Sequence, residues 1–140
     1  MPIINYRLDK ISGERTNVVA ESVDINSNFT IKEVKMDKDP ALGDFLRVFF
    51  EFSVEYKPDL GNMKFEGNIW YYSDNLRKDI EEKKDTIKLK ADVVKEVSIA
   101  IIRDSLLEGV EFSRKLRLPV PIKMPRFDIK TKDAEFPKKV

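Results

Sequence analysis

The most regular pattern in the chain lies between residues 47 and 72, where apolar and polar positions alternate. Residues 47–56 and 63–72 each follow a period of two, which is typical of a strand with one buried face. Residues 57–62 include Pro58 and Gly61 and predict a hairpin loop between the two strands. One face of this pair carries Val48, Phe50, Phe52, Val54, Tyr56, Met63, Phe65, Gly67, Ile69 and Tyr71.

The front of the chain predicts two further strands. Residues 4–8 alternate between apolar and polar, and Gly13 is expected to end that strand. Residues 23–34 form a longer extended segment, in which we expect a bulge or a break near residues 26–28. Residues 37–43 have the composition of a turn. Together the four strands predict one mainly antiparallel sheet.

The back of the chain predicts helices. Ser73 or Asp74 can cap a short helix through residues 76–80, and Asp92 can cap a long helix that continues towards Leu116. The prolines that follow exclude helix beyond that point. The expected fold is α+β, with a four-stranded, mainly antiparallel sheet and a short and a long helix packed on one face. We expect one domain over residues 1–128 and a polar, basic tail over residues 129–140.

The long helix has more apolar surface than one sheet covers. Its apolar residues form two stripes about 140° apart, at the usual roughly 100° per residue. A helix that is apolar over more than half its circumference needs two packing partners. One is its own sheet, and the simplest second partner is the same helix of another copy. The residues predicted for this oligomer interface are Val94, Val97, Ile99, Ile101, Ile102, Leu106 and Val110.

Two apolar groups remain outside the expected core. Phe49, Trp70 and Tyr72 point away from the apolar face of the strand pair. Either another subunit or the tail covers them, or they form a surface that accepts apolar segments of another chain. Residues 116–127 alternate prolines with large apolar side chains and predict a rigid extended strip. This strip either packs back across the sheet as a lid or walls a binding groove.

Composition excludes several kinds of chemistry. The 140 residues include no cysteine and no histidine, which rules out disulfides, thiolate metal sites, His-based triads and ordinary zinc catalysis. Residues 24–28 resemble the start of a calcium-binding loop. Such a loop has Gly at its sixth and Glu at its twelfth position, but these positions hold Phe29 and Lys35 here. The five glycines are scattered and form no phosphate-binding loop. We therefore expect no enzyme, no cofactor and no metal site.

The net charge of +1 hides a gradient along the chain. Residues 114–140 carry nine Lys or Arg against three Asp or Glu, whereas residues 1–113 carry seventeen against twenty-two. This basic end is either a solvated tail or a site for an anionic partner or an acidic second subunit. An alternative function is therefore nucleic-acid binding, although the aromatic residues that would stack on bases lie in the acidic part. Its candidate residues are Arg114, Lys115, Arg117, Lys123, Arg126, Lys138 and Lys139.

The sequence shows no pattern typical of a membrane helix or a signal peptide. No stretch approaches the roughly 18 consecutive apolar residues of a membrane helix. The first ten residues lack the basic-then-apolar layout of a signal peptide. The expected location is the cytoplasm.

The order of these parts resembles the SecB export-chaperone family, closest to its archaeal-type SecB-like members. The resemblance runs from about residue 3 to residue 128 and is carried by residues 48–54, residues 65–71, Leu118 with Pro119, and residues 126–128. It implies a homotetramer, a dimer of dimers with the main helices between sheets. It also implies an ATP-independent holdase that binds non-native polypeptides in apolar surface grooves, either for export or as a toxin–antitoxin-associated chaperone.

The resemblance and the apolar surfaces together give a set of client-binding candidates. They come from the connection before the third strand, from the outward aromatic residues and from the proline strip, where Met124 adds an adaptable contact. These candidates are Leu42, Phe45, Phe49, Trp70, Tyr72, Pro119, Val120, Pro121, Ile122, Met124 and Phe127.

Overall fold

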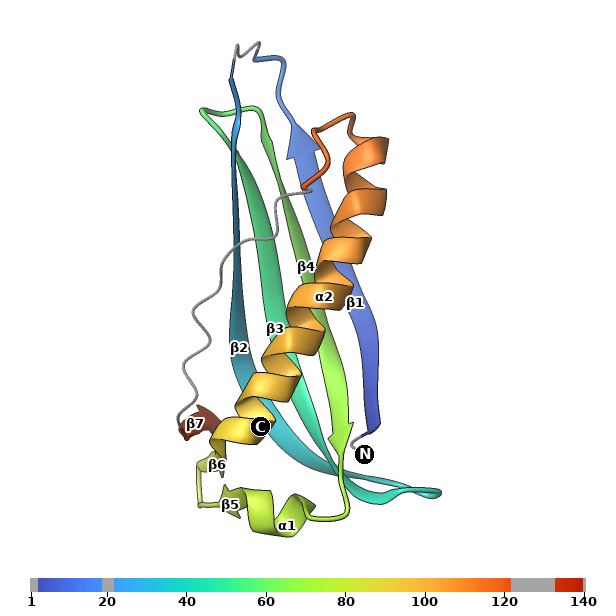
Figure 1. Cartoon of the computed structure of the whole chain (residues 1–140), viewed down its shortest axis with the longest axis vertical. Helices are drawn as coiled ribbons and strands as arrows, with labels where there is room; N and C mark the ends of the chain where they lie inside the picture. Colours follow the sequence, from blue (N-terminus) through green and yellow to red (C-terminus); the bar gives the residue numbers. More distant parts are fainter. Residues whose placement is uncertain (1–2, 19–21, 122–132, 140) are drawn as a thin grey trace.

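The computed structural model describes residues 3–18, 22–121 and 133–139. Four long strands form one antiparallel sheet in the order β1-β4-β3-β2, and a long helix lies obliquely across one face of it (Figure 1). A short helix and a second, three-stranded sheet in the order β5-β6-β7 gather at one end. The elements are β1 (Ile3–Arg15), β2 (Asp24–Asp39), β3 (Gly43–Lys57), β4 (Gly61–Tyr72), α1 (Leu76–Asp79), β5 (Ile80–Glu82), β6 (Thr86–Leu89), α2 (Ala91–Lys115) and β7 (Ala134–Pro137).

The core lies between the large sheet and α2. The strand face predicted to be apolar is the face that α2 covers, and this inner face supplies two adjoining apolar clusters. Tyr6 stacks on Phe50, with ring centroids 5.2 Å apart, and its hydroxyl is 2.8 Å from Ser105 Oγ of α2. Tyr71 donates a hydrogen bond of 2.8 Å to Glu96 of α2. The α+β fold expected from the sequence is confirmed.

Two strands are longer than the sequence predicts. β1 continues through Gly13, where a Cβ would lie 2.8 Å from the ring of Phe112, so glycine lets α2 approach the strand. β2 continues through the predicted turn residues to Asp39. The bulge predicted near residues 26–28 is wrong, because the register shifts between Ile31 and Glu33. The alternation of exposed and half-buried residues continues through Ser27, which lies at an inward position. Because Ser27 is polar, the sequence suggested a break there.

The helix caps also differ from the prediction. α1 begins after Asn75 and α2 after Lys90, and neither residue makes a side-chain capping bond. Asp92 lies inside the first turn of α2, while Asp133 accepts a hydrogen bond of 3.1 Å from the backbone N–H of Ala91. Residues just before β7 therefore cap the long helix. The expected tail over residues 129–140 contains β7, which pairs with β6.

Candidate functional site

The face of the large sheet opposite α2 carries a group of aromatic side chains around an arginine. We call Phe45, Arg47, Phe49, Trp70 and Tyr72 the outer-face cluster. The first three come from β3 and the last two from β4, and Arg47 is the register partner of Trp70. Their common face follows from the strand period, since successive inward residues of β3 fill the core. Phe45 lies within β3, not in the connection before it as the sequence predicted.

The rings of the cluster are stacked. Phe45 and Trp70 lie with centroids 4.4 Å apart and an interplanar angle of 23°. The Arg47 guanidinium lies 5.1 Å from the Trp70 ring centroid and 5.5 Å from that of Phe45. Phe45 is only 1% exposed, whereas Trp70, Phe49 and Tyr72 are half-buried. Phe45 therefore supports the surface, and the other three aromatic residues present ring area to solvent.

Two buried polar groups on this face have unused hydrogen-bonding capacity. Arg47 pairs with Asp37 at 3.3 Å, but its Nε has no partner among the described residues. Asn68 is fully buried and donates a hydrogen bond of 2.9 Å to Asp9, while its Oδ1 likewise has no partner in the described part of the chain. A buried donor or acceptor left unpaired is costly, so the packing of this face lowers the stability of the fold at these two atoms.

The other half of the outer face is covered by paired charges. Lys32, the bulged residue of β2, lies 2.8 Å from Glu51 and 2.9 Å from Glu66, and Lys64 lies 3.1 Å from Glu51. Hydrogen bonds from Lys32 hold the pKa of both glutamates below their ordinary value. The outer face is therefore aromatic towards the α1 end and ionic towards the β3–β4 hairpin.

A pocket of about 320 Å³ opens beside the aromatic half. Tyr72 and Leu42 line one side of it, and α1 lines the other. Arg77 of α1 is 2.6 Å from Asp44 at its rim. Leu42 and Tyr72, two of the client-binding candidates, thus border one hollow next to the outer-face cluster.

The described part of the proline strip lies elsewhere. Pro119 accepts a hydrogen bond of 2.7 Å from Tyr56 at the far end of β3, and Pro121 packs near Gly109 of α2. Tyr56 follows Phe45 by eleven positions in β3, which is about 36 Å of strand at roughly 3.3 Å per residue. Val120 is half-buried, and Ile122, Met124 and Phe127 lie outside the described residues. The structure therefore separates residues 119–121 from the outer-face cluster by both face and end.

The predicted interface residues divide between the two sides of α2. Val97, Ile101, Ile102 and Leu106 are buried within the chain, and Val94 and Val110 are half-buried. Ile99 is 44% exposed. Leu107, which is not among the predicted interface residues, is 65% exposed and lies two turns beyond Ile99. Its i, i+8 spacing from Ile99 is the signal that could have identified it.

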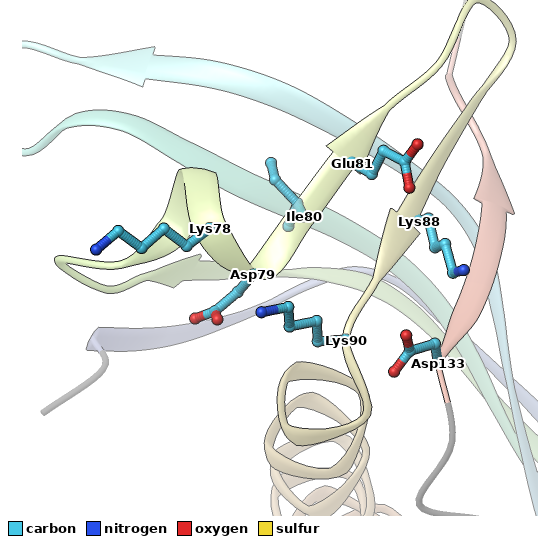
Figure 2. A pocket seen from close by; sticks show the side chains of 7 residues that line it. All are labelled: Lys78, Asp79, Ile80, Glu81, Lys88, Lys90 and Asp133. Carbon is cyan, nitrogen blue, oxygen red and sulfur yellow. The ribbon is translucent and has the colours of Figure 1, made fainter.

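A smaller pocket of about 160 Å³ lies where α2, the β5–β6 hairpin and the start of β7 meet (Figure 2). Its lining combines three lysines with three carboxylates around Ile80, so it carries no net charge that would select an ion. Asp133 is engaged with the start of α2. We therefore interpret this pocket as a junction between elements and not as a functional site. Its lining residues are Lys78, Asp79, Ile80, Glu81, Lys88, Lys90 and Asp133.

The remaining predictions concern ions, membranes and nucleic acid. The described residues contain no cluster of three or more metal-ligating side chains. No helix within residues 3–18, 22–121 and 133–139 is long and apolar enough to cross a membrane. Arg114, Lys115 and Arg117 are exposed at the end of α2, away from the outer-face cluster, while Lys123 and Arg126 lie outside the described residues.

Comparison with protein-family models, with curated proteins and with solved structures finds no match. The resemblance to the SecB family therefore remains a prediction from the sequence.

Proposed function

We propose that this protein is an ATP-independent holdase chaperone that binds non-native polypeptide on the outer face of its large sheet. One observation carries the proposal: Phe49, Trp70 and Tyr72 present aromatic surface on the face that α2 does not cover. Large aromatic side chains with an arginine among them are the residues that dominate protein-binding surfaces. The absence of cysteine makes the fold independent of redox state, which is compatible with the cytoplasm expected from the sequence.

The arrangement suits weak and general binding. Burying apolar area yields about 25 cal/mol per Å², so a few aromatic contacts contribute several kcal/mol, while the ordering of an unfolded client opposes them. The half-buried rings of Phe49, Trp70 and Tyr72 contact apolar and aromatic side chains of any sequence, as a holdase requires.

Trp70 gives a direct test, because it is the only tryptophan in the chain. A tryptophan-free unfolded client should shift its emission and protect it from acrylamide quenching. Wild-type protein should also suppress aggregation of that client, and Phe49→Ala with Trp70→Ala should lose most of this suppression. Ile11→Ala, which removes a 45% exposed apolar residue elsewhere, serves as the matched control. Full activity of the double variant would overturn the proposal.

We further propose that the protein self-associates through the outward side of α2, in line with the oligomer expected from the sequence. Ile99 and Leu107 are large apolar side chains exposed there, with Arg103 midway between them. An antiparallel second copy, related by a two-fold axis beside Arg103, brings Ile99 of each copy opposite Leu107 of the other.

The charges of α2 fit the same register. In this arrangement, residues equally far from Arg103 on its two sides face each other across the interface. Lys95 then lies opposite Glu111, and Asp92 lies opposite Arg114. All four residues are exposed. Every such pair occurs twice in a symmetric dimer, and opposite charges at such positions select partner and orientation. The two Arg103 residues would face each other, but each already contacts Asp104 at 3.3 Å, which compensates the local charge.

Charge reversal tests this register. Lys95→Glu should lower the dimer fraction by about tenfold in native mass measurements, because it sets like charges opposite each other twice. Adding Glu111→Lys should restore the dimer, and Lys84→Glu, an exposed position outside α2, should have no effect. A wild-type protein that stays monomeric at high concentration would overturn the assembly but not the client-binding surface.

A further inference from the structure

A segment near the C-terminus of the chain covers part of the outer-face cluster. We define residues 134–139 as the C-terminal clamp. Beyond β7, its backbone follows the edge of β2, where the N–H of Lys139 donates a hydrogen bond of 3.0 Å to Val34 O. The Lys139 Nζ then lies 4.4 Å from the ring centroid of Phe49 and 3.8 Å from Glu33. The cation therefore covers an aromatic ring of the proposed client surface.

The contacts that hold the clamp are individually weak. β7 is only four residues long and pairs with one neighbour, β6. Phe136 is its one large apolar side chain, and it is half-buried. The remaining attachments are two backbone hydrogen bonds, from Lys138 to Asp85 O and from Lys139 to Val34 O, and ion pairs of exposed or part-exposed groups, namely Glu135 with Lys83, Lys138 with Glu82 and Lys139 with Glu33. Exposed ion pairs contribute little and are screened by salt, so this segment is a candidate for local release.

We propose that the C-terminal clamp is an intramolecular competitor of client binding, which occupies Phe49 until a client displaces it. This inference rests on the proposed chaperone function. A ring that carries a cation–π contact cannot give its face to a second partner. Client binding and clamp docking are then mutually exclusive at Phe49, and thermodynamic linkage requires each to weaken the other equally.

The competition predicts how variants change affinity for a fluorescein-labelled, permanently unfolded client protein. Lys139→Ala removes the contact on Phe49 without touching the client surface, and should tighten binding by about 3- to 10-fold. Lys139→Arg keeps the cation and should bind like wild type. Lys84→Ala, an exposed lysine between β5 and β6 and away from the outer-face cluster, is the matched control and should stay within about twofold.

A second readout follows the clamp itself. Addition of client should accelerate hydrogen exchange at the Lys139 amide several-fold, because displacement breaks its bond to Val34. Equal or weaker client binding by Lys139→Ala, or unchanged exchange at Lys139 in the wild-type complex, would overturn the clamp while leaving the chaperone function intact. Failure of wild type and every variant to bind client would overturn both.

Discussion

The two faces of the large sheet use similar residues for different purposes. On the inner face, Phe50 and Phe65 are at most 1% exposed beneath α2. On the outer face, Phe49 and Trp70 occupy neighbouring positions of the same strands but remain half-buried, beside an arginine and a network of paired charges. The comparison shows that residue type alone does not separate the core from the partly exposed face here. The element that covers each face does.

The largest expected difference is between two adjacent phenylalanines. Phe50→Ala should cost about 3–5 kcal/mol of unfolding free energy, because it leaves a cavity under α2. Phe49→Ala should cost about 1 kcal/mol or less, since its ring is only half-buried. Urea unfolding of both variants measures the contrast. Equal losses would mean that the two faces do not differ in packing.

Asn68 tests the polar part of the outer face. Asn68→Asp should destabilise the protein by about 3 kcal/mol at pH 7, because a fully buried carboxylate would then lie beside Asp9. Burial and the neighbouring charge would raise the pKa of the introduced acid in the folded state. The loss should therefore shrink as the pH falls towards 4, in unfolding curves collected across that range. A loss independent of pH would contradict this placement.

Gly67 tests the spacing between β1 and β4. A Cβ at this position would lie 2.2 Å from the carbonyl oxygen of Arg7, which is backbone and cannot move aside. Gly67→Ala should cost about 1–3 kcal/mol. Gly109→Ala in α2 meets only ordinary contacts of 3.6 Å or more, and should gain up to about 1 kcal/mol from helix propensity. Thermal unfolding of the Gly67→Ala and Gly109→Ala variants measures the contrast. A loss of stability in both variants would mean that the effect at Gly67 is not specific to its close contact with Arg7.

The smallest expected effect concerns the charged half of the outer face. Hydrogen bonds from Lys32 lower the pKa of Glu51 and Glu66 from their ordinary 4.5, so the pairing stabilises the fold above that pH and is lost as pH falls through the lowered values. Lys32→Met should therefore cost about 0.5–1 kcal/mol at pH 7 and almost nothing at pH 3. High salt at pH 7 should also reduce the difference, because Lys32 is 43% exposed.

Strand alternation was enough to predict the two faces. The period of two in β3 and β4 assigned Phe49, Trp70 and Tyr72 to the face opposite Phe50 and Phe65, because side chains of a strand must alternate. It also predicted the antiparallel pairing. The resemblance to the SecB family predicts Phe45 in the connection before the third strand, whereas Phe45 lies within β3.

Features that depend on contacts distant in sequence could not be predicted. β5, β6 and β7 are only three or four residues long, which is too short for a periodic signal, and they form only where they meet. Lys32 at the bulge pairs with Glu51 and Glu66 on other strands, so no local pattern within β2 indicates the bulge. The position of Lys139 over Phe49 follows from β7 pairing, and no local pattern indicates it.

The outer face has an aromatic half and an ionic half, so its two ends differ in chemistry. An extended segment laid along β3 would meet rings at one end and, about 20 Å further on, alternating positive and negative groups. Under the proposed function, a client segment with an apolar part beside a charged part would fit this face in one orientation and meet mismatched chemistry in the other. The order of apolar and charged parts along the client would then decide how it lies on the sheet.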